Sequence, residues 1–281
     1  MFVRRSFVAA GLIAALACVP LVGRGAPSAD APAELTIAYQ PGLSYSSLIV
    51  MRERGSLEKQ FPQTKITWLV LNSTAAVRDG FIADQIQIGA GSIPPFLTGW
   101  DRGVGWKILA SLNQMSVWQR ARARHRDDHP TGLQALSVGQ LNAHLSGPPF
   151  QYEEVQRGGH VVLRSFDVFG PHTFNSVYVN EKFANEHPHF VQAFYHDLLD
   201  ATQFLKQNPG GAADILAKDE GGNVSAHDFE GWLRRKDVIF STTPHGFLAM
   251  AKFMQSIGNL TKTPRSMHDI NYSGTLGGAG D

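Results

Sequence analysis

The 281-residue sequence contains one cysteine, Cys18, which lies in an apolar N-terminal segment. Once that segment is removed, no thiol remains, and this excludes disulfides, cysteine nucleophiles and cysteine-ligated metals. Charged residues are also few, at 17% of the sequence, and the formal net charge is +1. A nearly neutral chain gives no electrostatic reason to expect binding to nucleic acid or to an acidic membrane surface.

Sequence patterns of common catalytic sites are missing as well. There is no Gly-x-Ser-x-Gly nucleophile elbow and no phosphate loop ending in Gly-Lys-Ser/Thr. The eleven histidines are densest at His187, His189 and His196, but no His-Glu-x-x-His spacing accompanies them. We therefore expect no metal site and no cofactor, and a binding protein in preference to an enzyme.

The N-terminus has the order of a secretory signal peptide. Arg4 and Arg5 precede an apolar run over residues 7–22, and small residues follow up to Ala31. The run is too short to be a good membrane span, and no later segment reaches the ~20 apolar residues that a spanning helix requires. Residues 1–31 are therefore predicted to direct export to the periplasm. The arginine pair fits the twin-arginine route as well as the general secretory route.

The processing site has several candidates. Residues 29–31 have the small-x-small form, but Pro32 directly afterwards would hinder cleavage. Cleavage near Gly25 or Ser28 is the alternative. A lipid anchor through Cys18 is a further alternative, because the residues before it resemble an acylation box.

After the signal segment, short apolar runs alternate with helical patterns, which is typical of an α/β fold. The predicted strands cover residues 35–39, 66–71, 86–90, 107–112, 141–145, 160–163 and 175–179. The predicted helices begin at Ser46 or Ser47 and at Pro94, and also cover 75–83, 131–138, 148–155, 188–209, 212–217, 226–233 and 247–257.

An internal echo suggests two similar lobes. Residues 84–96 and residues 139–150 each contain a turn with glutamine, a strand, a loop of small residues and the sequence Pro-Pro-Phe. In open α/β sheets, ligands bind beyond the carboxyl ends of the strands. Both loops are therefore expected to point into the space between the lobes.

These residues also carry a family resemblance. Residues 37–42 (IAYQPG), 89–91 (GAG) and 139–151 (GQLNAHLSGPPFQ) resemble the periplasmic substrate-binding proteins of nitrate, sulfonate and taurine ABC importers. The thiamine-pyrimidine synthase family shares that fold. The likeness covers residues 35–117 and 129 to about 260. It implies a two-lobe periplasmic-binding-protein type II fold with two crossing segments, closing on a ligand and serving a membrane permease and an ATPase.

The sequence departs from that family after Trp118. Residues 119–128 (QRARARHRDD) are rich in arginine and have no apolar periodicity. The family would have the opening strand and helix of its second lobe here, and a βαβ unit takes ~30 or more residues. An internal deletion or a local reading-frame error would leave the second lobe incomplete. The alternative is a charged surface loop; nucleic-acid binding is disfavoured because no aromatic residues are interleaved.

The expected organisation follows from these boundaries. Residues 1–31 are the signal peptide, 32–117 the first lobe, 118–128 the atypical junction and 129–180 a partial second lobe. Residues 181–270 are predicted to form helices that pack back on the lobes, and 271–281 a flexible tail.

Candidate ligand-binding residues lie in the loops that follow the strands. Helix N-termini can hold an anion through backbone N–H groups, although each residue there can equally be a plain cap. The residues expected at such starts are Ser73, Thr74, Gly91, Ser92 and Ser146. Gln40, Gly42, Ser44 and Tyr45 in the first loop, and His144, His172 and Thr173 in the second half, complete the set.

Three functional hypotheses follow. The first is a monomeric solute-binding component of an ABC importer for a small anion, with an aliphatic sulfonate or taurine favoured over nitrate. The second is an exported enzyme on the same scaffold that acts on a pyrimidine-type compound, with His144 or His172 reactive. The third is a ligand-binding sensor subunit.

Overall fold

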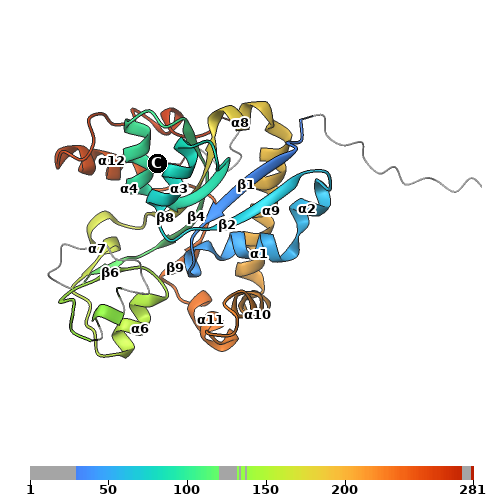
Figure 1. Cartoon of the computed structure of the whole chain (residues 1–281). Coiled ribbons are helices and arrows are strands. Elements are labelled where there is room, and N and C mark those ends of the chain that lie inside the picture. The colour runs from blue at the N-terminus through green and yellow to red at the C-terminus, as the bar shows by residue number, and fades with distance from the viewer. Residues whose placement is uncertain (1–29, 120–131, 133, 137, 274–279) are drawn as a thin grey trace, which may run out of the picture.

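A six-stranded sheet forms the centre of the computed structural model, which describes residues 30–119, 132, 134–136, 138–273 and 280–281 (Figure 1). The strand order is β2 (Lys65–Val70), β1 (Glu34–Tyr39), β3 (Ile88–Ser92), β8 (Thr173–Asn180), β4 (Trp106–Met115) and β9 (Val238–Phe240). β1 is parallel to β2 and β3, whereas β8 is antiparallel to β3 and β4. The ends of β1, β3 and β4 and the start of β8 therefore share one edge, called the carboxyl edge below.

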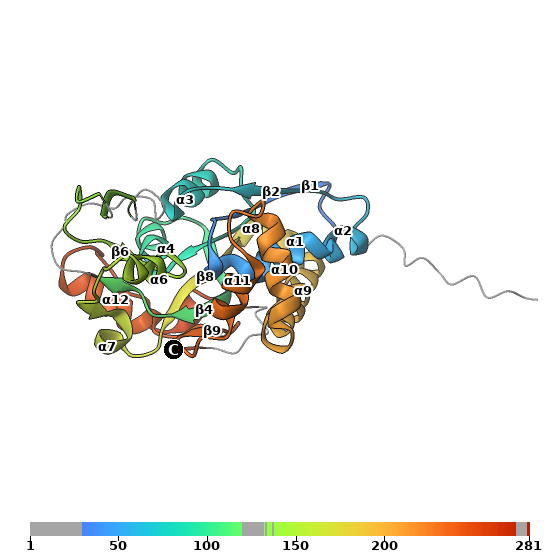
Figure 2. The same ribbon diagram turned by 90° about the horizontal axis from the view of Figure 1, so that it is seen from below.

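Helices cover both faces of this sheet, as the two views in Figures 1 and 2 show. One face packs against α1 (Ser46–Arg54), α2 (Ser56–Gln60), α9 (Pro188–Gln207), α10 (Pro209–Asp219) and α11 (Ala226–Leu233). The other packs against α3 (Thr74–Ile82), α4 (Ile93–Asp101) and α12 (Phe247–Ser256). The short elements are η1 (Leu43–Tyr45), α8 (Glu181–Glu186) and η2 (Met267–Asp269). Each face thus has its own apolar core.

A smaller second lobe lies beside the carboxyl edge. Its sheet has the order β6 (Leu145–Ser146), β5 (Trp118–Gln119) and β7 (Leu163–Arg164), with α6 (Phe150–Gln156) and α7 (Ser165–Phe169). The chain crosses between the lobes after β4 and again before β8. The predicted two-lobe α/β fold is confirmed. None of the helices in the described ranges has the length and apolar character needed to span a bilayer.

Local sequence explains the longest helix. On one side of α9, apolar residues recur every three or four positions and are buried: Phe190, Phe194, Leu198, Ala201 and Leu205. After α9, Asn208 starts the next helix by accepting a hydrogen bond from the Gly211 N–H at 3.1 Å. Pro209 follows in the first turn, where its missing N–H costs nothing.

The start of α1 differs from the prediction. Neither Ser46 nor Ser47 caps it; the N-cap residue is Tyr45, without a side-chain hydrogen bond. The Ser46 hydroxyl donates to the Leu43 carbonyl at 2.6 Å, and the Ser47 hydroxyl lies 3.1 Å from the Thr202 hydroxyl of α9. Both serines are buried, so they hold η1 and α9 against α1.

The predicted second-lobe strands are mostly absent. Of the strands predicted there, only Leu145–Ser146 and Leu163–Arg164 form. Each is two residues long because its partner β5 offers only two residues for pairing. Although the expected boundaries assign residues 173–180 to the second lobe, they form β8 of the large sheet. The segment 1–29 with Cys18, most of the arginine-rich junction, and residues 274–279 of the expected tail lie outside the described residues.

Glycines in β3 allow α3 to approach the sheet closely. A Cβ atom on Gly89 would lie 2.6 Å from Phe81 Cε2 and 2.7 Å from Val77 Cγ1. A Cβ on Gly91 would lie 2.3 Å from Thr74 Cγ2. These separations are shorter than any normal carbon–carbon contact, so the packing of α3 requires both glycines.

Replacing Gly89 by alanine should therefore destabilise the protein by about 1–3 kcal/mol through overpacking. Urea unfolding measures the loss. The control is Gly105→Ala, where a Cβ meets no atom within 4 Å and stability should be unchanged or slightly raised. Equal stability of the two variants would contradict the close packing of α3.

Candidate functional site

Polar residues from three strands meet at the carboxyl edge. Ser92 ends β3, Asn113 lies near the end of β4, and Asn175 lies near the start of β8. In the ladder, Asn175 is opposite both Ser92 and Asn113. The three residues are therefore direct neighbours across the sheet, which places the candidate site at this edge.

Gln40 connects the first loop to α3 and β3. Its side-chain nitrogen donates to Thr74 Oγ1 at 3.0 Å and to the Ala90 carbonyl at 3.2 Å. Thr74 Oγ1 also accepts from the Ser92 N–H at 3.3 Å, and Ser73 Oγ caps α3 through the Ala76 N–H at 3.2 Å. The structure thus brings four predicted residues together. Gly91, another predicted site residue, instead has a packing role against Thr74.

A buried polar group anchors the first loop to the sheet. Asn113 Nδ2 donates to the Ser44 carbonyl at 2.5 Å, and Asn175 Nδ2 donates to Ser44 Oγ at 2.8 Å. Asn113 Oδ1 is buried with no hydrogen-bond partner among the described residues. Tyr45 beside Ser44 is also buried, and this burial raises the pKa of its hydroxyl. Sequence reasoning included Ser44 and Tyr45 but missed both asparagines.

One signal could have identified these asparagines. Asn113 directly follows an apolar run that was predicted to end at Leu112, and Asn175 begins another. A buried amide at the end of a core strand needs hydrogen-bond partners. Its position therefore indicates a polar neighbour at the same edge of the sheet.

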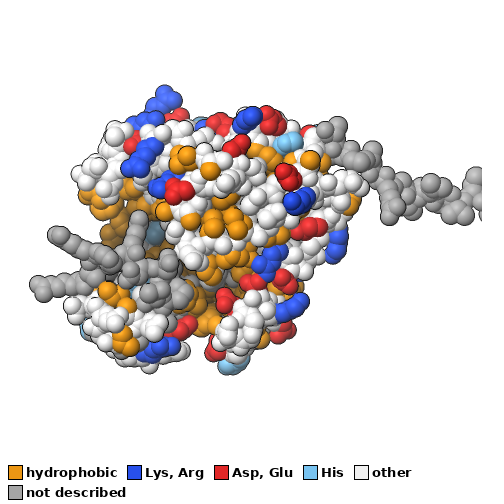
Figure 3. Space-filling model, viewed as in Figure 1, with side chains coloured by type: hydrophobic (Ala, Val, Ile, Leu, Met, Phe, Trp, Pro, Cys, Tyr) orange, Lys and Arg blue, Asp and Glu red, His pale blue; other side chains and the backbone are white. Residues whose placement is uncertain are grey.

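Loops of the two lobes face each other across this edge. Gly42, at a φ of 115°, has Phe150 Cε2 and the Pro148 carbonyl each 4.0 Å from the position of a Cβ. A Cβ on Gly147 in the second lobe would lie 2.7 Å from Phe174 Cζ of β8. Each lobe therefore presents a glycine to an aromatic ring of the other. Hydrophobic side chains are visible in the recess between the two lobes (Figure 3).

His144 and Ser146 do not join this group. His144 Nδ1 lies 2.6 Å from Glu154 Oε1, and the Ser146 hydroxyl donates to Glu154 Oε2 at 2.9 Å. Both residues are buried inside the second lobe, where Glu154 connects them to α6. A cavity of about 20 Å³ beside Trp118 and Gln151 has the size of one water molecule. The two predicted residues thus stabilise the second lobe.

Helix starts offer fewer amide donors than the sequence suggested. The first turn of α4 contains Pro94 and Pro95, and α6 follows Pro148 and Pro149; proline has no N–H. In α6, the Tyr152 N–H already donates to the Pro149 carbonyl at 2.9 Å. Of the three expected anion-holding helix starts, only α3 is free of proline.

His172 and Thr173 lie at the second crossing between the lobes. His172 Nδ1–H donates to the Gly170 carbonyl at 2.8 Å, and its ring contacts Phe166 and Phe169. Burial lowers the pKa of this histidine. Thr173 Oγ1 accepts from the His245 N–H at 2.9 Å. These contacts place His172 and Thr173 at the hinge. Neither residue belongs to the hydrogen-bonded group around Gln40.

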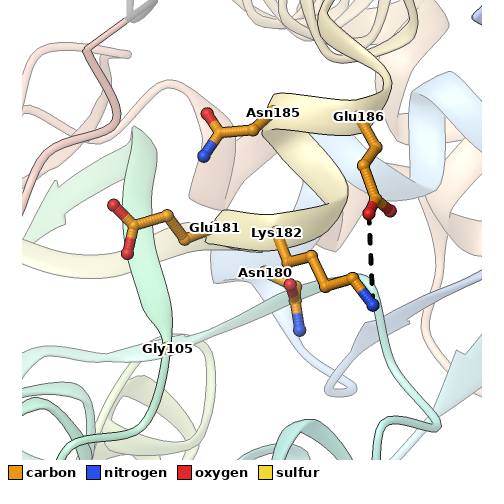
Figure 4. Close-up of a pocket in the computed structure, with 6 residues that line it drawn as sticks. All are labelled: Gly105, Asn180, Glu181, Lys182, Asn185 and Glu186. Atoms are coloured by element: carbon orange, nitrogen blue, oxygen red, sulfur yellow. Dashed lines mark ion pairs between the residues drawn. The ribbon is translucent and has the colours of Figure 1, made fainter.

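A larger cavity lies elsewhere. It has a volume of about 570 Å³ and is lined by Gly105, Asn180, Glu181, Lys182, Asn185 and Glu186 (Figure 4). Gly105 precedes β4 and Asn180 ends β8, so this cavity is at the sheet edge opposite the candidate site. Its Lys182 Nζ is paired with Glu186 Oε1 at 4.0 Å. Within the described ranges, no three His, Cys, Asp or Glu side chains are grouped as metal ligands would be.

The Ser44 anchor gives a testable prediction. Ser44→Ala removes the acceptor of the Asn175 amide in a buried place, which should cost about 1–3 kcal/mol of unfolding free energy. Urea titration measures this loss. Ser256→Ala, on the exposed end of α12, is the control and should change stability little. An unchanged midpoint for Ser44→Ala would mean that the Asn175 bond is not formed in solution.

The hinge histidine gives a second prediction. Because burial lowers the pKa of His172, the unfolded chain binds this proton at a higher pH than the folded chain. The contribution of His172 to the unfolding free energy should be fully present above the ordinary histidine pKa of about 6.5 and should decrease as the pH drops below it. His172→Gln should flatten this fall between about pH 7 and 5, measured as unfolding free energy. His227→Gln, on the surface of α11, should retain it; equal slopes would contradict the assignment.

Comparisons with known proteins agree with the two-lobe fold. Neither a protein-family model nor a curated protein matches the sequence. Solved structures do match. The alkanesulfonate-binding protein SsuA from Xanthomonas axonopodis pv. citri, bound to MOPS, has 18% identity and a TM-score of 0.69, covering 83% of this chain and 96% of that one. The zinc-bound ligand-binding component of an ABC-type import system from Staphylococcus aureus has 13% identity and a TM-score of 0.71, covering 88% and 99%.

A third structure names the architecture. The Candida albicans CA3427 gene product, described as exhibiting the generic periplasmic binding protein structural fold, has 12% identity and a TM-score of 0.61. The match covers 82% of this chain and 92% of that one. At these identities the likeness concerns the arrangement of the chain in space. The chain therefore has the periplasmic binding protein fold.

Proposed function

We propose that this protein is the solute-binding component of an ABC importer, which captures a small anion between its two lobes. Aliphatic sulfonates and taurine are favoured over nitrate. The observation that carries the proposal is the meeting of the two lobes at the carboxyl edge, where Gly42 faces Phe150 and Gly147 faces Phe174. Ligands of open α/β sheets bind at this kind of edge.

The chemistry of the edge suits a small polar guest. Donors for an anion come from neutral side chains: the Ser44 hydroxyl, and the second amide hydrogens of Asn113 and Asn175, each of which donates only one hydrogen to Ser44. The start of α3 adds backbone N–H groups and the positive end of a helix dipole, which favour an anion without a cationic side chain. Aromatic rings at Phe150 and Phe174 add apolar walls, which favour a ligand with a short carbon chain over an inorganic ion.

Closure of the lobes supplies the mechanism. A ligand that contacts both lobes binds the closed state more tightly than the open one, so it shifts the population towards closure. The two crossing segments, after β4 and before β8, are the hinge. Where the first segment enters the second lobe, the Val117 N–H donates to Ser165 Oγ at 2.9 Å, and the Ser165 N–H donates to the Val117 carbonyl at 2.8 Å. The closed monomer would be recognised by a permease and ATPase after export to the periplasm. The sulfonate-binding and import-system neighbours support this role.

Calorimetric titration of the mature protein tests the ligand class. Ethanesulfonate, butanesulfonate and taurine should each release or absorb heat with a saturable isotherm, and nitrate should bind more weakly. Phe150→Ala should weaken sulfonate binding by about tenfold, equivalent to about 1.4 kcal/mol of lost contact. Val155→Ala, on the exposed side of the same helix, is the matched control. Absence of heat and of thermal stabilisation with every anion would remove this ligand class.

A further inference from the structure

The first described residues are bound to the folded body. The Thr64 hydroxyl donates to the Pro32 carbonyl at 2.7 Å, and the Lys65 N–H donates to the Ala33 carbonyl at 2.9 Å. Pro32 itself is buried. Residues 32 and 33 therefore continue the edge of the β1–β2 pairing before β1 begins.

Asp30 is bound more extensively, and to a different element. Its carbonyl accepts a hydrogen bond from His187 Nδ1–H. Its carboxylate oxygen Oδ2 accepts from the His189 N–H at 2.9 Å and lies 2.9 Å from His189 Nδ1. The Asp30 side chain is only 18% exposed, in contrast to the 73% of the His189 side chain. These contacts, called the Asp30 clasp below, attach the start of the domain to α9.

The Asp30 clasp fills a gap at the start of α9. Its N-cap residue, His187, makes no side-chain capping bond, and Pro188 has no N–H to offer. Asp30 supplies the missing acceptor from elsewhere in the chain, and its negative charge lies at the positive end of a 20-residue helix. A carboxylate in this place stabilises the helix that forms much of one core.

This geometry bears on where the export signal is removed. The small-x-small pattern at residues 29–31 would place cleavage between Ala31 and Pro32. Cleavage there would discard Asp30 and the clasp together.

We infer that the processing site lies before Asp30, so that Asp30 belongs to the mature domain and acts as the cap of α9. Cleavage near Gly25 or Ser28 would make the first residue of the mature protein one of residues 26–30, and processing at Cys18 would also retain Asp30. This inference rests on the proposed export of the chain. It excludes cleavage after Ala31.

Intact mass and N-terminal sequencing of protein purified from the periplasm of a bacterial host, expressed from the full chain, test the site. A first residue between 26 and 30 supports the inference. A lipid-modified Cys18 as first residue also retains Asp30 and supports it. A first residue of Ala31 or later overturns it while leaving export intact. A chain that still begins at Met1 overturns the export proposal itself, and its mass distinguishes this result from the others.

Thermal unfolding tests the role of the carboxylate independently. Asp30→Ala in the mature chain, and separately a mature chain that begins at Pro32, should each lower the melting temperature by about 2–4 °C. Asp214→Ala, exposed on α10, is the matched control and should leave it nearly unchanged. Asp30→Asn should lower the melting temperature by less than Asp30→Ala does, because the amide oxygen can still accept from the His189 N–H. Melting temperatures of Asp30→Ala and of the shortened chain equal to that of the parent would overturn the inference.

Discussion

Strand β8 is the element on which the rest of the structure depends. It returns from the second lobe, enters the large sheet between β3 and β4, and pairs with both along most of its length. Val177, Tyr178 and Val179 are completely buried, so both faces of the strand contribute to the two cores. Without β8, β4 and β9 would not be attached to β1, β2 and β3. The fold of the first lobe thus requires a strand that the chain reaches only after building the second.

The position of β8 between β3 and β4 also determines which residues meet at the carboxyl edge. Because β8 runs against its neighbours, its start lies beside the ends of β3 and β4, and Asn175 comes between Ser92 and Asn113. The same start carries Phe174, which faces Gly147 of the other lobe. Hydrogen-bonding groups and the contact between the lobes therefore occur at one edge. A guest held there would touch both lobes at once.

The second lobe has a shorter-stranded sheet and a smaller apolar core than the first. Its sheet consists of two-residue strands, and half of the large exposed hydrophobic residues in the described part of the chain lie within it: Val138, Leu145, Val155, Val162, Leu163 and Val168. A lobe that leaves so many apolar side chains in water buries little surface on folding. This agrees with the proposal that a strand and helix of this lobe are missing from the sequence. The Glu154 bonds to His144 and Ser146 gain importance where the apolar core is small.

Local signals sufficed for much of the fold but not for its assembly. The alternation in β1 and the spacing of Phe190, Phe194 and Leu198 in α9 depend only on neighbouring residues, and both elements were predicted. β9 is three residues long and exists only because β4 is beside it, so no local pattern marks it.

The candidate site shows the same difference between residues that local sequence indicates and residues that depend on distant partners. Gln40, Thr74 and Ser92 were predicted as site residues because they follow strands or begin helices. Asn113 and Asn175 were missed because their importance comes from Ser44, more than sixty residues away from either in sequence. His144 and Ser146 were placed at the cleft because their partner, Glu154, could not be inferred from spacing.

If the two lobes close on a guest at the carboxyl edge, the distance between them becomes shorter on binding, and measuring this distance tests the closure most directly. A chain that begins after Cys18 has no cysteine, so Asp79→Cys on α3 and Gln156→Cys on α6 would carry the only two spin labels; both positions are exposed. Pulsed electron resonance then gives the distribution of label distances with and without saturating butanesulfonate. With the ligand, the label distances should become shorter and their distribution narrower. An identical distribution at proven saturation would contradict this closure.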